Sequence, residues 1–72
     1  MIDMKIEKEL RRLDGGEKRL SVISWNKRPA KLDLRAWHEK DGETRPGKGI
    51  TLTDAEAKDL LDALQVYLNG RA

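Results

Sequence analysis

Apolar side chains recur at every second position through the first fifty residues, in short runs separated by turn-forming residues. The clearest run spans residues 31–38, where Leu32, Leu34 and Ala36 alternate with charged or aromatic residues. Strict alternation is typical of an antiparallel strand with one buried and one solvent-facing side. The other runs of this character are shorter or less regular and span residues 4–13, 19–26 and 49–52. The pattern therefore predicts four strands.

Turn-forming residues separate these runs. Glycine adopts backbone conformations that other residues avoid, and proline cannot donate a hydrogen bond to a central strand ladder. Such residues cluster at 14–16, 26–29, 41–42 and 46–47. The segments between them are too short for a set of helices but have the length of strands.

The period changes after residue 52. Thr53 and Glu56 have the spacing of a capping box, in which each side chain bonds the other residue's backbone N–H. Apolar residues then follow at helical spacing, at Ala57, Leu60, Leu61, Leu64 and Leu68. Gly70 is a stop signal. This segment therefore predicts a helix of about four turns.

The predicted architecture is a single α+β domain over residues 1–72, with its core at about 4–69 and a β-β-β-β-α order. One helix is expected to cover one face of a four-stranded sheet and to leave the other open. By alternation, the open face should carry Lys31, Arg35 and Trp37. Five apolar helix positions are more than a small sheet needs. We therefore expect part of the stripe, at Leu60, Leu61, Leu64 and Leu68, to pack on a partner helix.

Size also favours self-association. A chain of 72 residues builds a marginal core, and small domains are usually reinforced by disulfides, a metal or oligomerisation. The sequence has no cysteine and one histidine, His38, so neither a disulfide nor a thiolate or histidine metal site is expected. A symmetric homodimer is the commonest remaining solution. No cofactor is expected.

Charge is unevenly distributed along the chain. Residues 18–52 hold nine lysines and arginines against four aspartates and glutamates, a net charge of +5. The flanking segments carry −1 (residues 1–17) and −2 (residues 53–72). A basic face with a neutral or acidic back is typical of polyanion binding, although a charge-rich surface can show such segregation by chance. No apolar run reaches the roughly 18 residues of a membrane span and no secretory segment follows Met1, so a cytoplasmic location without membrane association is expected.

The sequence offers no plausible catalytic set, and we expect a protein that is not an enzyme. Nucleophilic catalysis needs a base that a third group orients, and His38 sits near a strand end, where a surface role fits better. The helix carboxylates Asp54, Asp59 and Asp62 lie on its polar face and are expected to be solvated.

Binding chemistry is better supplied. Trp37 shares a predicted face with Lys31 and Arg35, and Trp25 precedes Lys27 and Arg28. An exposed aromatic ring stacks on an unpaired base with about 1–3 kcal/mol, while basic side chains neutralise phosphates. The alternative for either tryptophan is a place in the core.

Three nearby residues have subsidiary roles. Asp33 lies between Lys31 and Arg35 and is expected to pair with and orient Arg35. Gly47 and Gly49 flank Lys48. The two glycines either let the backbone approach a phosphate or meet the needs of turn geometry, and the second reading fits general experience better.

Taken together, these pieces resemble a known family. The segments Ser24-Trp25-Asn26, 31–37 and 46–52, followed by the capped helix from Thr53, are similar to the positive cofactor 4 family of transcriptional coactivators, and particularly to its small bacterial YdbC-like members. The resemblance covers roughly residues 18–68 and is specific in combination. Eukaryotic members have an Arg-x-x-Trp spacing where this chain has Arg35-x-Trp37, with His38 in the next place.

The resemblance implies a curved sheet, a dimer formed partly through the helix, and single-stranded DNA bound by the sheets and loops. Transferred by position, DNA contacts fall at Trp25, Lys31, Arg35, Trp37 and Lys48, with Lys27, Arg28 and Arg45 in loops of variable length. We therefore expect a homodimeric single-stranded DNA-binding protein of little sequence specificity, acting in transcription regulation or in replication and repair, with the transcription machinery as a further partner. The alternatives are single-stranded RNA binding and an adaptor that docks an acidic protein on its basic sheet face.

Overall fold

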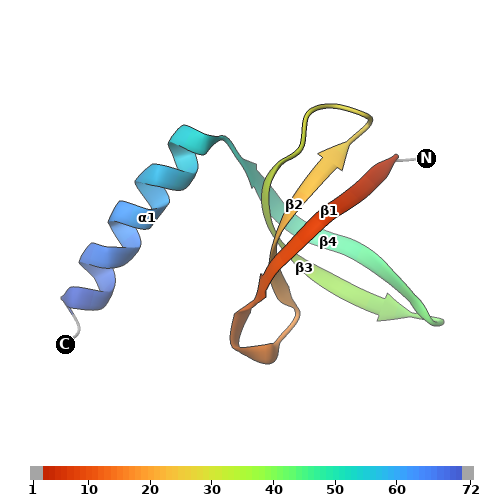
Figure 1. Ribbon diagram of the computed structural model, residues 1–72. Helices are drawn as coiled ribbons and strands as arrows, with labels where there is room; N and C mark the ends of the chain where they lie inside the picture. The colour runs from red at the N-terminus through yellow and green to blue at the C-terminus, as the bar shows by residue number, and fades with distance from the viewer. Residues whose placement is uncertain (1–2, 71–72) are drawn as a thin grey trace.

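The computed structural model describes residues 3–70 and shows one antiparallel sheet followed by one helix (Figure 1). The elements are β1 (Met4–Arg12), β2 (Lys18–Trp25), β3 (Lys31–Lys40), β4 (Glu43–Leu52) and α1 (Asp54–Asn69), with a short 3-10 turn at Leu13–Gly15 between β1 and β2. The strands lie in chain order, β1-β2-β3-β4. The predicted sequence of four antiparallel strands and a C-terminal helix is confirmed.

Tight turns follow β2 and connect β3 to β4. Asp41 and Gly42, between β3 and β4, have φ values of 54° and 78°. Asn26 and Lys27, after β2, have φ values of 51° and 62°, and Arg28 N–H donates to the Trp25 carbonyl at 2.9 Å. Positive φ at both central residues gives the turn a twist that matches the flanking strands. The turn residues seen in the sequence thus set the strand ends.

Strand β4 is longer than predicted, because it begins at Glu43 and runs through Pro46. A proline is tolerated there because β4 is an edge strand. The β3–β4 register shifts between Arg35 and Trp37. Next to this shift, a Cβ on Gly49 would overlap the Cα and Cβ of Arg35. Gly49 is thus required for close packing of β4 on β3, a role other than the turn geometry or phosphate approach expected from the sequence.

The two faces of the sheet are buried in the opposite sense to our prediction. The most buried residues are Ser21, Ile23, Asp33 and Trp37, each at most 4% exposed, and all share one face by strand register. No described residue of the helix is buried, so the curvature of the sheet itself encloses that face. We call it the concave face. The face carrying Arg35 and Trp37, expected to be open, is therefore the inner one.

The opposite, convex face is aliphatic. Its apolar residues pair across strands, Leu20 with Leu34, Val22 with Leu32, Leu34 with Ile50 and Leu32 with Leu52. Leu32, Leu34 and Ala36, expected to be core, are only half-buried, and Ile50 is 55% exposed. The convex face is thus a continuous apolar strip at the surface of the single chain.

Helix α1 extends away from the sheet (Figure 1). The predicted capping box is present: Glu56 N–H donates to Thr53 Oγ1 at 3.1 Å, and Thr53 N–H donates to Glu56 Oε1 at 2.9 Å. The expectation that the helix covers the sheet is wrong, since none of its residues is buried. Only Thr53 separates β4 from α1, so the chain has no loop in which to fold back. Among the described residues, no helix is long and apolar enough to cross a membrane.

Candidate nucleic-acid interface

Trp25 and Arg35 form an aromatic–cationic pair on the concave face. They come from the end of β2 and the middle of β3, and Arg35 Cζ lies 4.9 Å from the centroid of the Trp25 ring. A guanidinium over an indole face at this distance is a cation–π contact worth about 0.5–2 kcal/mol. The two side chains therefore form one stacked unit, with the guanidinium over the indole face.

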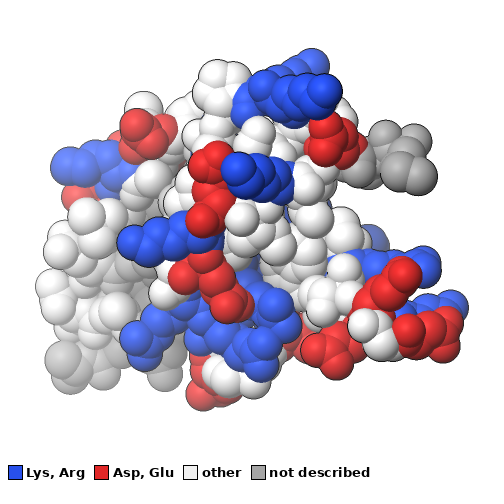
Figure 2. All heavy atoms as spheres, turned by 45° about the vertical axis from the view of Figure 1, so that its right-hand side comes forward, with Lys and Arg blue, Asp and Glu red and all other residues white. Residues whose placement is uncertain are grey.

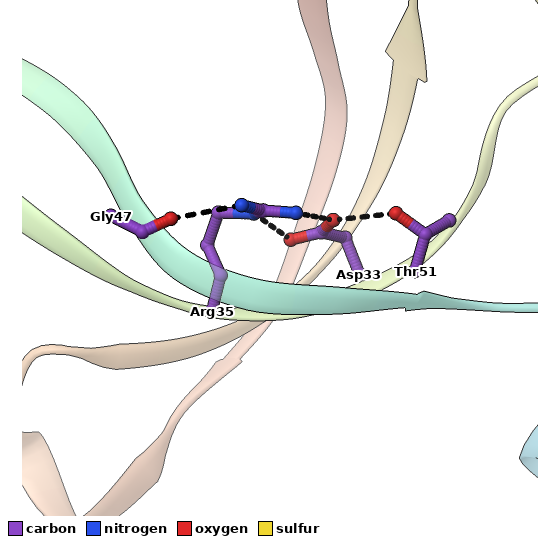
Figure 3. Close-up of polar contacts among 4 residues, drawn as sticks. All are labelled: Asp33, Arg35, Gly47 and Thr51. Atoms are coloured by element: carbon purple, nitrogen blue, oxygen red, sulfur yellow. Dashed lines mark hydrogen bonds and ion pairs between the residues drawn. The ribbon is translucent and has the colours of Figure 1, made fainter.

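A hydrogen-bond network fixes the Arg35 guanidinium (Figure 3). Its Nε and Nη2 donate to the two carboxylate oxygens of Asp33 at 2.8 and 2.9 Å, and its Nη1 donates to the Gly47 carbonyl at 2.9 Å. Thr51 Oγ1 donates to Asp33 Oδ2 at 3.1 Å. The Asp33 side chain is fully buried, and that of Arg35 is 16% exposed. The prediction that Asp33 pairs with and orients Arg35 is confirmed.

This network changes the role expected of Arg35. Bidentate pairing with Asp33 occupies the donor edge that would otherwise grip a phosphate. The flat face of the guanidinium and the second N–H of each of Nη1 and Nη2 remain available to a ligand. Unpaired bases stack on arginine planes as well as on aromatic rings. Arg35 is therefore better suited to stacking than to neutralising a phosphate.

An open hollow lies beside this pair. It has a volume of about 330 Å³ and is lined by Trp25, Arg35, Pro46, Gly47 and Thr51. An indole, a guanidinium and a proline ring are flat or apolar surfaces, and the Gly47 and Thr51 atoms lie at the edge of the Asp33 network. The hollow can thus accept a planar, partly polar group such as a nucleobase.

The two tryptophans have different environments. Trp25 is partly exposed, whereas Trp37 is only 4% exposed and belongs to the core. The expectation that Trp37 lies on an open face is therefore wrong, because the concave curvature encloses it. Of the two, Trp25 has a ring that an added base can reach.

The predicted basic residues fall into two groups. Lys27 and Arg28 in the β2–β3 loop, and Lys31 at the start of β3, are exposed close in sequence to Trp25 or to the Asp33–Arg35 pair. Lys48 instead lines a different hollow, whose other lining residues are Lys18, Leu34, Arg35 and Ala36. Arg45 pairs by register with His38, and its Nη2 lies 3.1 Å from Glu43. The structure therefore does not bring Lys48 and Arg45 to the Trp25 hollow.

Acidic side chains interrupt the basic surface. Figure 2 shows lysines and arginines interspersed with aspartates and glutamates on the face in view. On this face, positive and negative side chains are thus mixed rather than separated.

Side chains that could hold a metal ion do not cluster in the described part of the chain. No group of three or more histidines, cysteines, aspartates or glutamates there is arranged to hold a metal ion. His38 is exposed, and its Nδ1 lies 3.7 Å from Glu17 Oε2.

Sequence reasoning missed Thr51 and the Gly47 carbonyl as partners of the Asp33–Arg35 pair. Both come from β4, and their positions depend on the pairing of Asp33 with Thr51 and on the register shift beyond Arg35. A register that includes a bulge is a property of two strands together. The spacing of residues in one strand therefore gives no signal for these partners.

Comparison with known proteins places the chain in context. A family model described as Transcriptional Coactivator p15 (PC4) matches residues 13–63, which include β2, β3, β4 and the first half of α1 but not β1. An uncharacterized protein of Treponema pallidum (strain Nichols) is 47% identical over 51 residues. That alignment covers 71% of this chain and 58% of the relative, so the chain spans less than two thirds of the relative's length.

Proposed function

We propose, from the premise that the chain belongs to the transcriptional coactivator p15 (PC4) family, that it binds single-stranded DNA on its concave face. The family is known for single-stranded DNA binding and coactivation. The observation that carries the proposal is the Trp25 hollow, in which an accessible indole is stacked against an arginine whose orientation is fixed. Unpaired bases offer the flat faces that such a surface accepts, and duplex bases do not.

The surrounding charges suit a bound strand of any sequence. Lys27, Arg28 and Lys31 are exposed near the hollow and can neutralise backbone phosphates, which releases counterions. Stacking and phosphate contacts carry little sequence information. We therefore propose weak sequence preference and a role in transcription regulation, replication or repair wherever single strands are exposed. Single-stranded RNA is the alternative ligand of the same surface.

We further propose that the functional unit is a homodimer. The single chain has an accessible surface of 6046 Å², against about 4,500 Å² expected for a compact monomer of this mass. Its radius of gyration is 13.8 Å, where about 11 Å is expected. An excess of roughly 1,500 Å² per chain is in the range that obligate dimers bury.

The excess surface is apolar where a dimer would need it. The convex strip is half-exposed, and the helix stripe of Leu60, Leu61, Leu64 and Leu68 lies mostly at the surface. Leu61, Leu64 and Leu68 are 51%, 46% and 61% exposed. We propose that the helix stripe and the convex strip form the dimer interface, and this leaves both concave faces free.

The test is a titration with oligo-dT and with a matched duplex at moderate salt, followed by tryptophan fluorescence. We expect the single strand to bind tighter than the duplex and to quench emission, since a base stacks on Trp25. Trp25→Leu should lower oligo-dT affinity by about 1–3 kcal/mol. It should also remove most of the quenching, because the remaining tryptophan, Trp37, is buried and no base can stack on it.

Two outcomes would overturn the proposal. Equal, weak binding of both nucleic acids without quenching would leave only a generic charged surface and would turn attention to the protein adaptor. Undiminished quenching in Trp25→Leu would mean that bases do not stack at the Trp25 hollow.

A further inference from the structure

The far end of the concave face, at the β1–β2 hairpin, holds a second unusual cluster. Arg12 on β1 and Arg19 on β2 are register partners, so they lie directly opposite each other on one face. Like charges in such positions are destabilising. We infer that this pair forms a second anion-binding subsite, which takes a backbone phosphodiester of the strand that stacks on Trp25. This inference rests on the proposed function.

The two arginines have unsatisfied hydrogen-bonding capacity. The Arg12 guanidinium forms no hydrogen bond or ion pair with any other residue between 3 and 70. Arg19 Nε lies 3.5 Å from Glu9 Oε1, yet it is buried and makes no hydrogen bond within the described chain. Buried donors without an acceptor are rare in folded proteins and call for a specific explanation. An anion between the two guanidinium groups supplies the acceptor and relieves their repulsion.

A third donor lies at the same place. Arg12, Arg19 and Trp37 line one open hollow of about 380 Å³, together with the two glycines of the hairpin. Trp37 Nε1 is buried and lacks a hydrogen-bond partner among the described residues. The indole and the two guanidinium groups therefore supply donors from three side chains to one bound phosphodiester. Such charge-assisted hydrogen bonds are the strong ones.

Three carboxylates limit what the hollow accepts. Glu17 and Glu39 also line it, and Glu9 Oε1 lies 3.5 Å from Arg19 Nε, so three carboxylates surround the two arginines. This excess of negative charge disfavours a free, highly charged anion. A phosphodiester carries one negative charge, and a strand already held at Trp25 delivers it at high local concentration. The subsite is therefore expected to act on a tethered phosphodiester and to bind free inorganic phosphate poorly.

The separation of the two sites sets the strand length. Trp25 and Arg19 lie at opposite ends of β2, six residues or about 20 Å apart. At the duplex rise of about 3.4 Å per nucleotide this distance corresponds to roughly six nucleotides, and a single strand, which can extend further, spans it with fewer. Arg12 lies outside the residues 13–63 that match the family, so family membership does not imply the subsite.

The experiment compares Arg12→Gln with Arg11→Gln in binding dT4 and dT10. Arg11 is the adjacent residue with the same charge, but it pairs with Leu20 on the convex side and serves as the matched control. For dT10 we expect Arg12→Gln to weaken binding about five- to ten-fold and to reduce the slope of log affinity against log salt by about 0.7. For dT4 we expect a much smaller loss, because a strand this short reaches both sites only when it is fully extended.

Stability gives an independent readout. Since Arg12→Gln removes one of two opposed like charges, the unfolding midpoint should stay the same or rise. A lowered midpoint would point to a structural role and would overturn the subsite. Equal effects of Arg12→Gln and Arg11→Gln on dT10 would overturn it too, while quenching at Trp25 would leave the proposed function intact. If the wild-type protein binds neither oligonucleotide, both proposals fail.

Discussion

The two faces of the sheet differ in how fully residues of the same chain bury them. The concave face is closed by the chain itself, with Ile23 and Trp37 buried and Asp33 satisfied by Arg35 and Thr51. The convex face is a strip of aliphatic side chains that nothing in the described chain fully covers. The concave face thus buries polar groups within the single chain. The convex face leaves apolar groups exposed, and a second chain would be needed to cover them. The functions proposed above, strand binding and dimerisation, would therefore use opposite sides of one sheet.

The largest effect is expected from breaking the concave network. Arg35→Ala leaves the Asp33 carboxylate buried without its cationic partner, which should lower the free energy of unfolding by about 3–5 kcal/mol. Urea denaturation followed by circular dichroism measures this change. Lys31→Ala, on the same strand but exposed, is the control and should change stability by less than about 0.5 kcal/mol. Similar losses in the two variants would show that the concave face does not depend on the pair.

An intermediate effect is expected at the helix stripe, which is part of the proposed dimer interface. Leu61→Asp places a charge in the helix stripe and should weaken the dimer more than ten-fold, about 1.4 kcal/mol, since an unpaired charge is costly in an apolar interface. Light scattering over a concentration series measures the dissociation. Val66→Asp is the matched control, because Val66 is 73% exposed and lies off the stripe.

Thermal unfolding of the same variants tests the proposed dimer in a second way. In the wild type, the unfolding midpoint should rise with protein concentration, as it does for a dimer, and Leu61→Asp should reduce that dependence. A wild-type protein that remains monomeric at all concentrations would contradict the assignment of the convex face to assembly.

The smallest effect is expected from trimming the network at its edge. Thr51→Val removes the hydroxyl that donates to Asp33 Oδ2 while keeping the shape of the side chain, and should cost about 1 kcal/mol of stability. Thr44→Val, on the same strand and exposed, provides the comparison. If both variants unfold at the same urea concentration, the Thr51 bond contributes nothing measurable to the concave face.

The sequence alone determined some of these features well. Alternation gave the strands, the Thr53–Glu56 spacing gave the helix start, and the i, i+2 placement of Asp33 and Arg35 gave their pairing. Each of these depends on residues close together in the chain. The face to be enclosed could not be predicted, because alternation separates two sets of side chains but curvature decides which set lies inside.

The remaining misses have a similar origin. Trp37 is enclosed by the curl of the sheet, and Lys48 lines a different hollow from that of Trp25. The helix stripe reads as a sheet-covering surface, although the one-residue connection keeps the helix away from the sheet. These outcomes depend on how the strands pair and on which surface the proposed second chain would cover. Neither can be predicted from the spacing of residues along the chain.

Thr53 has a consequence for how assemblies of this kind can vary. As the only residue between β4 and α1, with extended backbone and a side chain that caps the helix, it fixes the direction in which the whole helix leaves the sheet. Each residue of a helix advances its side chains by about 100° around the axis. Adding or deleting one residue at this joint would therefore point the leucine stripe in a new direction without altering the helix or the concave face. In the proposed homodimer, the relative arrangement of the two chains would then change through this one position, while the concave face stays the same.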